Sequence, residues 1–224
     1  MVIDEQLAAE LPADPAAAVA LQQRLRALVE PHDPAPPHFG TIAGLDSAYD
    51  DAGNVVAAVV VLNATTLDQV DTATARGHTT FPYVPGLLAF RELPTTIAAL
   101  RQLTTTPDLL ICDGQGLAHP RRFGLACHLG LLTGVPTAGV AKTRWGDGAD
   151  PAPERGATAD ITIDGELVGR ALRTRTAVKP VYVSAGHRIS LETACAATLN
   201  LTPHYRQPET TRRADHLCRM LLRG

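Results

Sequence analysis

Residues 108–144 read DLLICDGQGLAHPRRFGLACHLGLLTGVPTAGVAKTR, in which two apolar runs lie on either side of a glycine-rich loop. The apolar runs predict strands at 108–112 and 136–141, and the residues between them predict a helix over 121–133. Two strands joined through a helix are parallel, and the crossover between them is right-handed. This stretch therefore predicts an α/β fold with a parallel part in its sheet.

Charged side chains are unevenly placed in the same stretch. The first apolar run ends at Asp113, and no further acidic residue follows before Asp147. The basic residues here are Arg121, Arg122, Lys142 and Arg144. A carboxylate at a strand end that faces positive charge suits a divalent cation beside a phosphate ester. The pattern therefore indicates phosphodiester chemistry.

The N-terminal part of the chain predicts a helix and a connector. Residues 14–30 have the spacing of an amphipathic helix, with Asp14 as N-cap and Pro15 at the first helical position. Residues 31–38 are rich in proline, which fixes φ and removes hydrogen-bond donors. We interpret both segments as an appendage of a single domain that spans residues 1–224.

Apolar, β-branched runs predict three further strands, at 41–46, 55–64 and 68–78, in an antiparallel meander. A helix should follow the loop that begins at Pro82 and run to about residue 103, and Pro94 should bend or restart it. The remaining elements expected are a hairpin with strands at 161–163 and 167–172 around Asp164-Gly165, a strand at 181–184, and helices at 190–200 and 210–222. Together they predict a mixed α/β sheet, antiparallel first and then parallel, flanked by helices.

The composition is that of a globular protein outside the membrane. The chain has 224 residues, 45% of them hydrophobic and 19% charged. Its longest strictly apolar stretch, 55–62, is far shorter than the ~20 residues of a membrane span. The acidic N-terminus does not resemble a secretory signal, and the four cysteines form no C-x-x-C pair. We expect reduced thiols, a cytoplasmic location, no membrane partner and a monomer.

The net charge is −3, yet the basic residues are clustered. Residues 167–191 contain five arginines and lysines and no acidic residue. Such a cluster is either a footprint for nucleic acid or a solvated surface, and charge alone favours the solvated surface.

Two aspartates at strand ends are the first candidates for catalysis. Asp46 follows the run TIAGL as Asp113 follows DLLIC, and an isolated aspartate in such a place is usually a turn residue. If the two strands are neighbours, however, the two carboxylates meet, and their repulsion favours a hard, oxygen-ligated Mg²⁺. Glu92, in the helix after the proline loop, is either a third acidic group or a surface residue.

Other candidates each have a structural alternative. Lys142 would hold the scissile phosphate or the attacking water, or else be a surface lysine. His119 would contact phosphate or a nucleotide, or cap the helix expected to begin at Arg121. His187 is interpreted as a capping residue before Ser190. On the last helix, Asp215 and His216 lie side by side, Leu217 and Leu221 should face inward, and the sequence does not choose between the two polar residues as a metal ligand.

Tyr83 lies on a loop stiffened by Pro82 and Pro85. The alternatives are a buried core tyrosine and a ring that wedges into a base stack, for which a rigid loop is a good support because little conformational entropy remains to be lost.

Five strings resemble the endonuclease V family, the deoxyinosine-directed repair nucleases. They are GLDSAYD (44–50), PYVPGLLAFRE (82–92), DGQGLAHPRRFGLACHLGLL (113–132), VPTAGVAKTR (135–144) and SAGHRIS (184–190). The resemblance runs in order from about residue 40 to 200. It implies a ribonuclease H-like fold and Mg²⁺-dependent hydrolysis, with Mn²⁺ as a substitute. The bond implied is the second phosphodiester 3′ to a hypoxanthine nucleotide, and the products carry 3′-hydroxyl and 5′-phosphate ends.

The same resemblance implies roles for individual residues. Asp46, Asp113 and Glu92 look like the metal-binding and catalytic carboxylates, Lys142 like the lysine near the cleavage point, and Tyr83 like the wedge. The last acidic or histidine ligand falls within 210–217, where Asp215 is preferred to His216. The DNA-binding set expected is Tyr83, Pro85, His119, Arg121 and Arg122. One Mg²⁺ would polarise a phosphoryl oxygen and help to ionise water, and a second would neutralise the leaving oxygen; the sequence does not set the number of ions.

The base has to be read outside the stack, because its edge is covered inside a duplex. We expect the backbone of Gly86, Gly114 and Gly116 to read hypoxanthine, and Leu88 and Leu125 to form a wall that excludes the exocyclic amine of guanine. Two alternatives remain open: the same site used mainly on inosine-containing RNA, and a damage-binding module that has lost its chemistry. The complete set of carboxylates and Lys142 weighs against the second.

Overall fold

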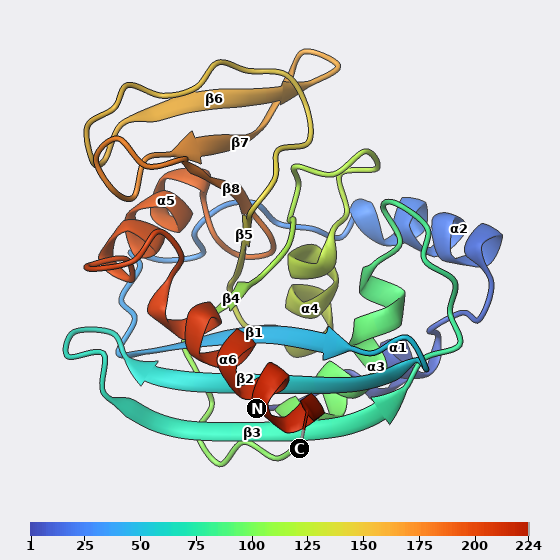
Figure 1. Cartoon of the computed structure of the whole chain (residues 1–224). Coiled ribbons are helices and arrows are strands. Elements are labelled where there is room, and N and C mark those ends of the chain that lie inside the picture. The colour runs from blue at the N-terminus through green and yellow to red at the C-terminus, as the bar shows by residue number, and fades with distance from the viewer. Residues whose placement is uncertain (224) are drawn as a thin grey trace.

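One mixed sheet of eight strands forms the centre of the computed structural model, which describes residues 1–223 and leaves Gly224 outside the described residues. The strands are β1 (Thr41–Tyr49), β2 (Asn54–Asn63), β3 (Gln69–His78), β4 (Leu109–Cys112), β5 (Thr137–Ala141), β6 (Thr158–Ile163), β7 (Glu166–Leu172) and β8 (Val181–Ala185). The helices are α1 (Glu5–Ala9), α2 (Pro15–Arg26), α3 (Ala89–Leu100), α4 (Leu125–Thr133), α5 (Leu191–Asn200) and α6 (Glu209–Arg223). Figure 1 shows their arrangement.

The strand order is β3-β2-β1-β4-β5-β8-β7-β6. β1, β2 and β3 pair antiparallel, whereas β1 with β4 and β4 with β5 pair parallel. The predicted meander followed by a parallel crossover is therefore confirmed. The expected hairpin is also present, and Asp164 and Gly165 at its turn have φ of 52° and 78°, as a two-residue turn of the left-handed kind requires.

Helices cover both faces of the sheet (Figure 1), and β1 shows how the faces are divided. Ala43 and Leu45 point into the core shared with α3 and α4. Gly44 points the other way, against α6, where an added Cβ would lie 2.3 Å from the carbonyl carbon of Thr210. Since side chains alternate along a strand, Asp46 lies on the same face as Gly44 and below α6.

Two boundaries differ from the prediction near the candidate site. The first strand does not stop at residue 46 but continues to Tyr49, so Asp46 lies inside β1 and pairs with Ala58 of β2. The helix expected over 121–133 begins only at Leu125, with Gly124 as N-cap. Arg122 has φ of 54°, a left-handed conformation that no helix can contain, and this explains the later start.

The N-terminal helix is shorter than predicted and is not an appendage. Asp14 caps α2 and Pro15 begins it, as expected, but the helix ends at Arg26, four residues earlier than predicted. Its apolar face belongs to the main core through Ala18, Leu21 and Leu25. α2 thus packs against the same core as α3 and α4.

The proline-rich connector, residues 31–38, has no regular structure, as predicted, but side-chain contacts fix its beginning. Asp33 accepts hydrogen bonds from the Ser190 amide and the Thr193 hydroxyl. His187 accepts from the Glu30 amide at 3.2 Å through Nδ1, while the N-cap of α5 is Ser190. The capping role expected for His187 is therefore wrong; this histidine anchors the connector.

Two other helices differ in detail from their predictions. α3 is continuous through Pro94, so the proline does not restart the helix, and buried Leu93 and Ile97 on either side hold it in place. On α6 the buried residues are centred on Ala214 and Cys218 rather than on the two leucines, which are only partly buried. The short helix α1, capped by Asp4, was not predicted.

The cysteine side chains and the lengths of the helices agree with the sequence predictions. Cys112, Cys127, Cys195 and Cys218 are all free and buried, as expected for reduced thiols. Within residues 1–223 no helix is both long enough and apolar enough to cross a bilayer.

Candidate active site

Asp46, inside β1, and Asp113, directly after β4, lie next to each other where the parallel pairing of these two strands ends. Leu45 pairs with Cys112, and the Asp113 amide donates to the Leu45 carbonyl at 3.3 Å, so the two aspartates form the next pair in register. Burial and the negative charge of Asp113 raise the pKa of Asp46, although its Oδ1 accepts the Ser47 amide. The predicted meeting of two carboxylates is found in the structure.

Glu92 joins this pair from the opposite face of the sheet. It lies in the first turn of α3 and is only 6% exposed. Burial, followed by the charge of Asp113, raises the pKa of Glu92 to about 8. The interpretation of Glu92 as a surface residue is therefore excluded, and the acidic residue instead contributes to one electrostatic cluster with both aspartates.

Lys142 follows β5 and supplies positive charge to the cluster. Its ammonium group donates to Oδ2 of Asp113. Burial opposes the charged form, but Asp113, Asp46 and Asp215 outweigh it and raise the pKa of Lys142. Lys142 is thus held as a cation by the carboxylates around it. Its single positive charge faces the three aspartates Asp46, Asp113 and Asp215.

Asp215 and His216 lie on different sides of α6. Asp215 acts electrostatically on Lys142 and on Cys218, whose thiol donates to the Asp46 carbonyl. His216 is exposed and lines a groove over β2 and β3. Of the two residues that the sequence leaves open, Asp215 is the one that faces the acidic cluster.

The donor set suits a magnesium or manganese ion that keeps part of its water. Within residues 1–223 no three histidine, cysteine or acidic side chains are arranged so that together they could hold a metal ion. Asp46 and Asp113 nevertheless provide two adjacent carboxylates whose mutual repulsion a cation would relieve. Mg²⁺ is bound in many enzymes by one or two carboxylates, with water and substrate phosphate completing its octahedron. The residues present fit that mode of binding.

A cleft of about 300 Å³ adjoins the acidic cluster. Glu92, Asp113 and Lys142 line one end of it. The rest of its wall includes Tyr83, Pro85, Gly86, Leu88, Gly114, His119, Leu125 and Trp145. Most of the residues expected around the base therefore surround one cavity, which is of a size suited to a small ligand or a nucleobase.

Gly116 is the exception among the expected pocket glycines. It is buried away from the cleft, and a Cβ added to it would lie 2.1 Å from the carbonyl oxygen of Ala185. Its amide donates to Ser184 Oγ at 2.8 Å. The expectation that Gly116 reads the base is wrong, because this glycine permits the loop after β4 to pack on β8.

The Gly86 carbonyl is fully engaged within the protein. It accepts from Gln22 Nε2 at 3.1 Å, from His119 Nε2 at 2.9 Å and from Arg121 Nη2 at 2.8 Å. It is therefore unavailable to a base, contrary to the expectation for this carbonyl. The three donors fix the loop that carries Tyr83, whose side chain is 72% exposed and so is no core residue.

His119 and Arg121 form the rigid support of this loop. His119 accepts the Arg121 amide at Nδ1 and uses Nε2 for Gly86, and burial lowers the pKa of His119 to about 4. The ring is neutral at pH 7 and has no nitrogen free for phosphate, and it does not cap α4. The Arg121 side chain donates to Gly86 and to Gln22, so it too has a structural role.

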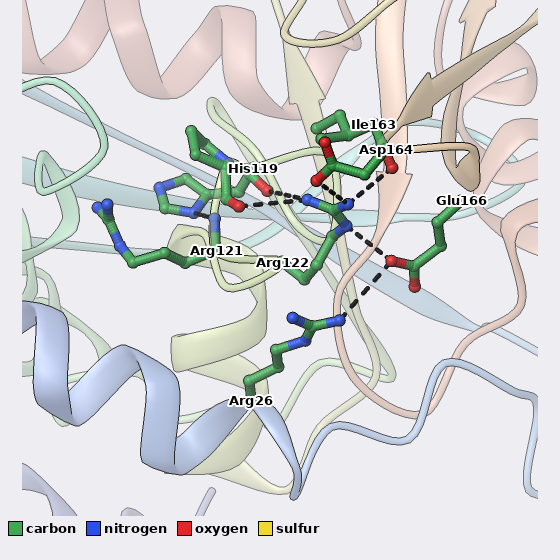
Figure 2. A network of polar contacts seen from close by, with 8 residues as sticks. Arg26, His119, Arg121, Arg122, Ile163, Asp164 and Glu166 are labelled. Carbon is green, nitrogen blue, oxygen red and sulfur yellow. Dashed lines mark hydrogen bonds and ion pairs between the residues drawn. The ribbon is translucent and has the colours of Figure 1, made fainter.

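Arg122 is buried at the centre of the polar network in Figure 2. Its guanidinium donates to Glu166 at 2.8 Å, to Asp164 at 3.1 Å and to the Ile163 carbonyl at 2.7 Å. Arg26 of α2 reaches the same Glu166 carboxylate at 3.6 Å. The expected phosphate contact of Arg122 is therefore wrong, since the side chain joins the loop after β4 to the β6–β7 hairpin.

Sequence reasoning missed three residues of the site. Gln22, 1% exposed, reaches from α2 to the Gly86 and Phe123 carbonyls. The Trp145 ring stacks on His119, with centroids 5.7 Å apart and planes at 6°. Tyr49 donates to Glu92 at 3.1 Å. A signal existed for Trp145, the single tryptophan of the chain, which directly follows the basic KTR.

Fold and site together define a nuclease, with paired carboxylates on neighbouring parallel strands and a lysine beside a base-sized cleft. The sequence model of the endonuclease V family matches residues 23–216. The chain belongs to the endonuclease V family.

Individual relatives agree with this assignment over nearly the whole chain. Endonuclease V of Nocardia farcinica is 62% identical over 215 residues, which are 96% of this chain and 95% of that protein. The crystal structure of endonuclease V from Streptomyces avermitilis is 57% identical, with a TM-score of 0.91 and 96% of both chains covered. Ciona intestinalis endonuclease V, 30% identical with a TM-score of 0.81 and 93% and 97% covered, was crystallised with a 24mer DNA containing an inosine followed by a ribo-adenosine.

Proposed function

We propose that this protein is a Mg²⁺-dependent repair endonuclease for deoxyinosine, the product of adenine deamination. It hydrolyses the second phosphodiester bond 3′ to the lesion and leaves 3′-hydroxyl and 5′-phosphate ends. The observation that carries this proposal is the Asp46–Asp113 pair, joined by Glu92 and Lys142 at the mouth of a base-sized cleft. The DNA complex of the Ciona relative supports the choice of inosine.

The carboxylates and the lysine have complementary roles in this proposal. Asp46 and Asp113 hold the metal, with Asp215 as a further ligand, and Mn²⁺ replaces Mg²⁺. When bound, the ion supplies Lewis-acid polarisation of the scissile phosphoryl group. Glu92 orients the attacking water and, when ionised, accepts a proton from it. Lys142 neutralises charge on the phosphate that is being cleaved.

The cleft determines which base is accepted. The Gly114 backbone is open to the cavity, and the nearest atom that an added Cβ would meet, on Leu125, is 3.6 Å away. Leu88 and Leu125 form an apolar wall, where an exocyclic amine would lose its hydrogen bonds and gain none. Tyr83 is exposed on a loop that is held by three side-chain donors to the Gly86 carbonyl. Its ring fills the space that the extruded base leaves.

The test is a nicking assay on duplexes that contain one inosine or one guanosine, with Mg²⁺, with Mn²⁺ and with chelator. We expect cleavage of the inosine strand alone, at the second bond 3′ to the lesion, and only with metal. A matched strand with a ribose at the lesion and at the next nucleotide measures RNA preference. Asp113→Asn should retain binding and lose cleavage by about a thousandfold or more. Full binding without any metal-dependent cleavage by the unmodified protein would instead indicate a damage-binding module.

The proposed enzyme is a monomer located in the cytoplasm. The four free, buried cysteines suit a reducing compartment. Light scattering in solution would test the oligomeric state.

A further inference from the structure

Glu92 has a single side-chain partner among the residues that the structure describes. This partner is Tyr49, the last residue of β1, whose phenol donates to Oε1 of Glu92 at 3.1 Å. Burial and the charge of Glu92 raise the pKa of Tyr49, so the phenol stays protonated and remains a donor. A buried carboxylate with one donor depends on that donor for its orientation.

Arg91 connects the same tyrosine to the loop that bears Tyr83. The Arg91 guanidinium carbon lies 5.3 Å from the centre of the Tyr49 ring, in a cation–π contact. Its Nη1 donates to the carbonyl of Phe81, two residues before Tyr83. The Phe81 ring in turn stacks on Phe90, with centroids 5.7 Å apart. Contacts therefore run without a break from the exposed loop to the buried carboxylate.

We propose that Tyr49 is a positioning residue for Glu92 and that Arg91 couples this positioning to the seating of the Tyr83 loop. The inference rests on the proposed function, since it assumes that Glu92 takes part in hydrolysis. When the loop engages a lesion, the Phe81 carbonyl and Arg91 hold Tyr49 over Glu92. When the loop is displaced, Glu92 loses its one donor and its orientation. Cleavage is thereby linked to recognition.

The surroundings of Tyr49 argue against a role in packing alone. Tyr49 is 36% exposed, and with Arg91 and Phe81 it lines an open, mainly polar cavity of about 450 Å³. Packing of the ring does not explain the hydroxyl, which makes the contact with Glu92. Replacing Tyr49 by Phe keeps the ring and the cation–π contact and removes only the donor.

The first experiment measures Tyr49→Phe in three ways: single-turnover cleavage of an inosine duplex with Mg²⁺, affinity for the same duplex without metal, and the thermal midpoint. We expect cleavage to fall about 10- to 100-fold, as for the loss of a hydrogen bond to a charged group, with affinity within about twofold. Tyr205→Phe is the matched control, because Tyr205 is exposed and its hydroxyl has no hydrogen-bond partner among the described residues; all three quantities should remain unchanged. Cleavage by Tyr49→Phe within about twofold of the unmodified rate would overturn the inference.

The second experiment tests the coupling through a double-mutant cycle. Tyr83→Ala should slow cleavage at saturating duplex, and this loss should be several-fold smaller in the Tyr49→Phe background, because the link to Glu92 is already broken. Independent, multiplicative effects would refute the coupling. Glu92→Gln separates the two proposals: if it cleaves normally, the proposed function fails, whereas if it is inactive and Tyr49→Phe is normal, only the positioning role fails.

Discussion

The neutral ring of His119 donates from Nε2 to the carbonyl oxygen of Gly86 at 2.9 Å, and this bond fixes the entrance of the cleft. Gly86 has φ of +80°, a left-handed conformation that favours glycine. The carbonyl can therefore point at its three donors while the chain turns from Tyr83 towards α3. The loop that bears Tyr83 is thus held by three side-chain donors that meet at the Gly86 carbonyl.

Gly86→Ala tests the importance of that peptide. The new Cβ would be strained at positive φ and would lie 2.8 Å from Arg121 Nη2, so we expect a loss of about 1–3 kcal/mol in unfolding free energy. We also expect weaker discrimination between inosine and guanosine duplexes, measured as a ratio of dissociation constants. Gly165→Ala is the control: φ is +78° and nothing lies within 4 Å, so the strain is similar and the cleft is untouched. Unchanged discrimination by Gly86→Ala would contradict the role of the loop.

The acidic cluster predicts how stability depends on pH in metal-free protein. The folded pKa of Glu92 is about 8, above its ordinary value of 4.5, and that of Asp46 is also raised. A carboxyl with a raised folded pKa stabilises the fold fully below its unfolded pKa, and this stability is lost as the pH rises through the folded value. The contribution of Glu92 to the unfolding free energy should thus fall by up to about 4 kcal/mol between about pH 4.5 and pH 8.

Calorimetry at pH 5, 6.5 and 8, with chelator and with Mg²⁺, checks this prediction. Mg²⁺ should raise the thermal midpoint most at pH 8, because it binds the ionised carboxylates whose repulsion it relieves. Glu92→Gln should flatten the pH dependence in chelator. In chelator, the same pH dependence for Glu92→Gln and the unmodified protein, or equal effects of Mg²⁺ at pH 5 and pH 8, would show that the carboxylates do not form a strained anionic cluster.

Arg122→Ala distinguishes a structural arginine from one that binds DNA. The variant loses donors to Glu166, Asp164 and the Ile163 carbonyl, so we expect a loss of about 2 kcal/mol in unfolding free energy. The slope of log affinity against log salt should stay the same, whereas the loss of one phosphate contact would reduce it by about 1. Arg175→Ala, at an exposed position, should leave stability unchanged.

Much of the site could be predicted because it depends on local order along the chain. Asp113 follows an apolar run, and the parallel crossover that this run begins places it beside β1. Asp46 was found in the same way, although the apolar run gave the wrong strand end: β1 continues to Tyr49, paired with β2 throughout. The pattern shows where apolar residues stop, and a strand ends where its partner ends.

Other features depend on contacts between distant segments, which no local pattern contains. Arg122 has the appearance of a phosphate-binding residue within HPRR, and only the fold brings Asp164 and Glu166 to it. Gln22 belongs to a helix that the sequence indicates as an appendage, yet its side chain lines the cleft and its amide donates to the Phe123 carbonyl. In both cases a polar side chain is committed by a tertiary partner about 40 to 100 residues away in the chain.

His128 gives a final prediction, on acid stability. The ring is fully buried between Phe90 and Phe123, and neither nitrogen has a hydrogen-bond partner among the described residues. Burial lowers the pKa of His128 to about 3, whereas its ordinary value is 6.5. Below about pH 6.5 the ring therefore binds a proton in the unfolded chain but not in the folded protein. The unfolding free energy falls from there down to about pH 3.

His128→Leu removes the titrating group and keeps the site apolar. Relative to the unmodified protein, the variant should gain about 2 kcal/mol in unfolding free energy between pH 7.5 and pH 5, measured by urea denaturation. His204→Leu, at an exposed position, should gain nothing over the same range. An equal pH dependence of His128→Leu and the unmodified protein would mean that the buried ring already accepts a proton in the fold, which its apolar surroundings of two phenylalanines oppose.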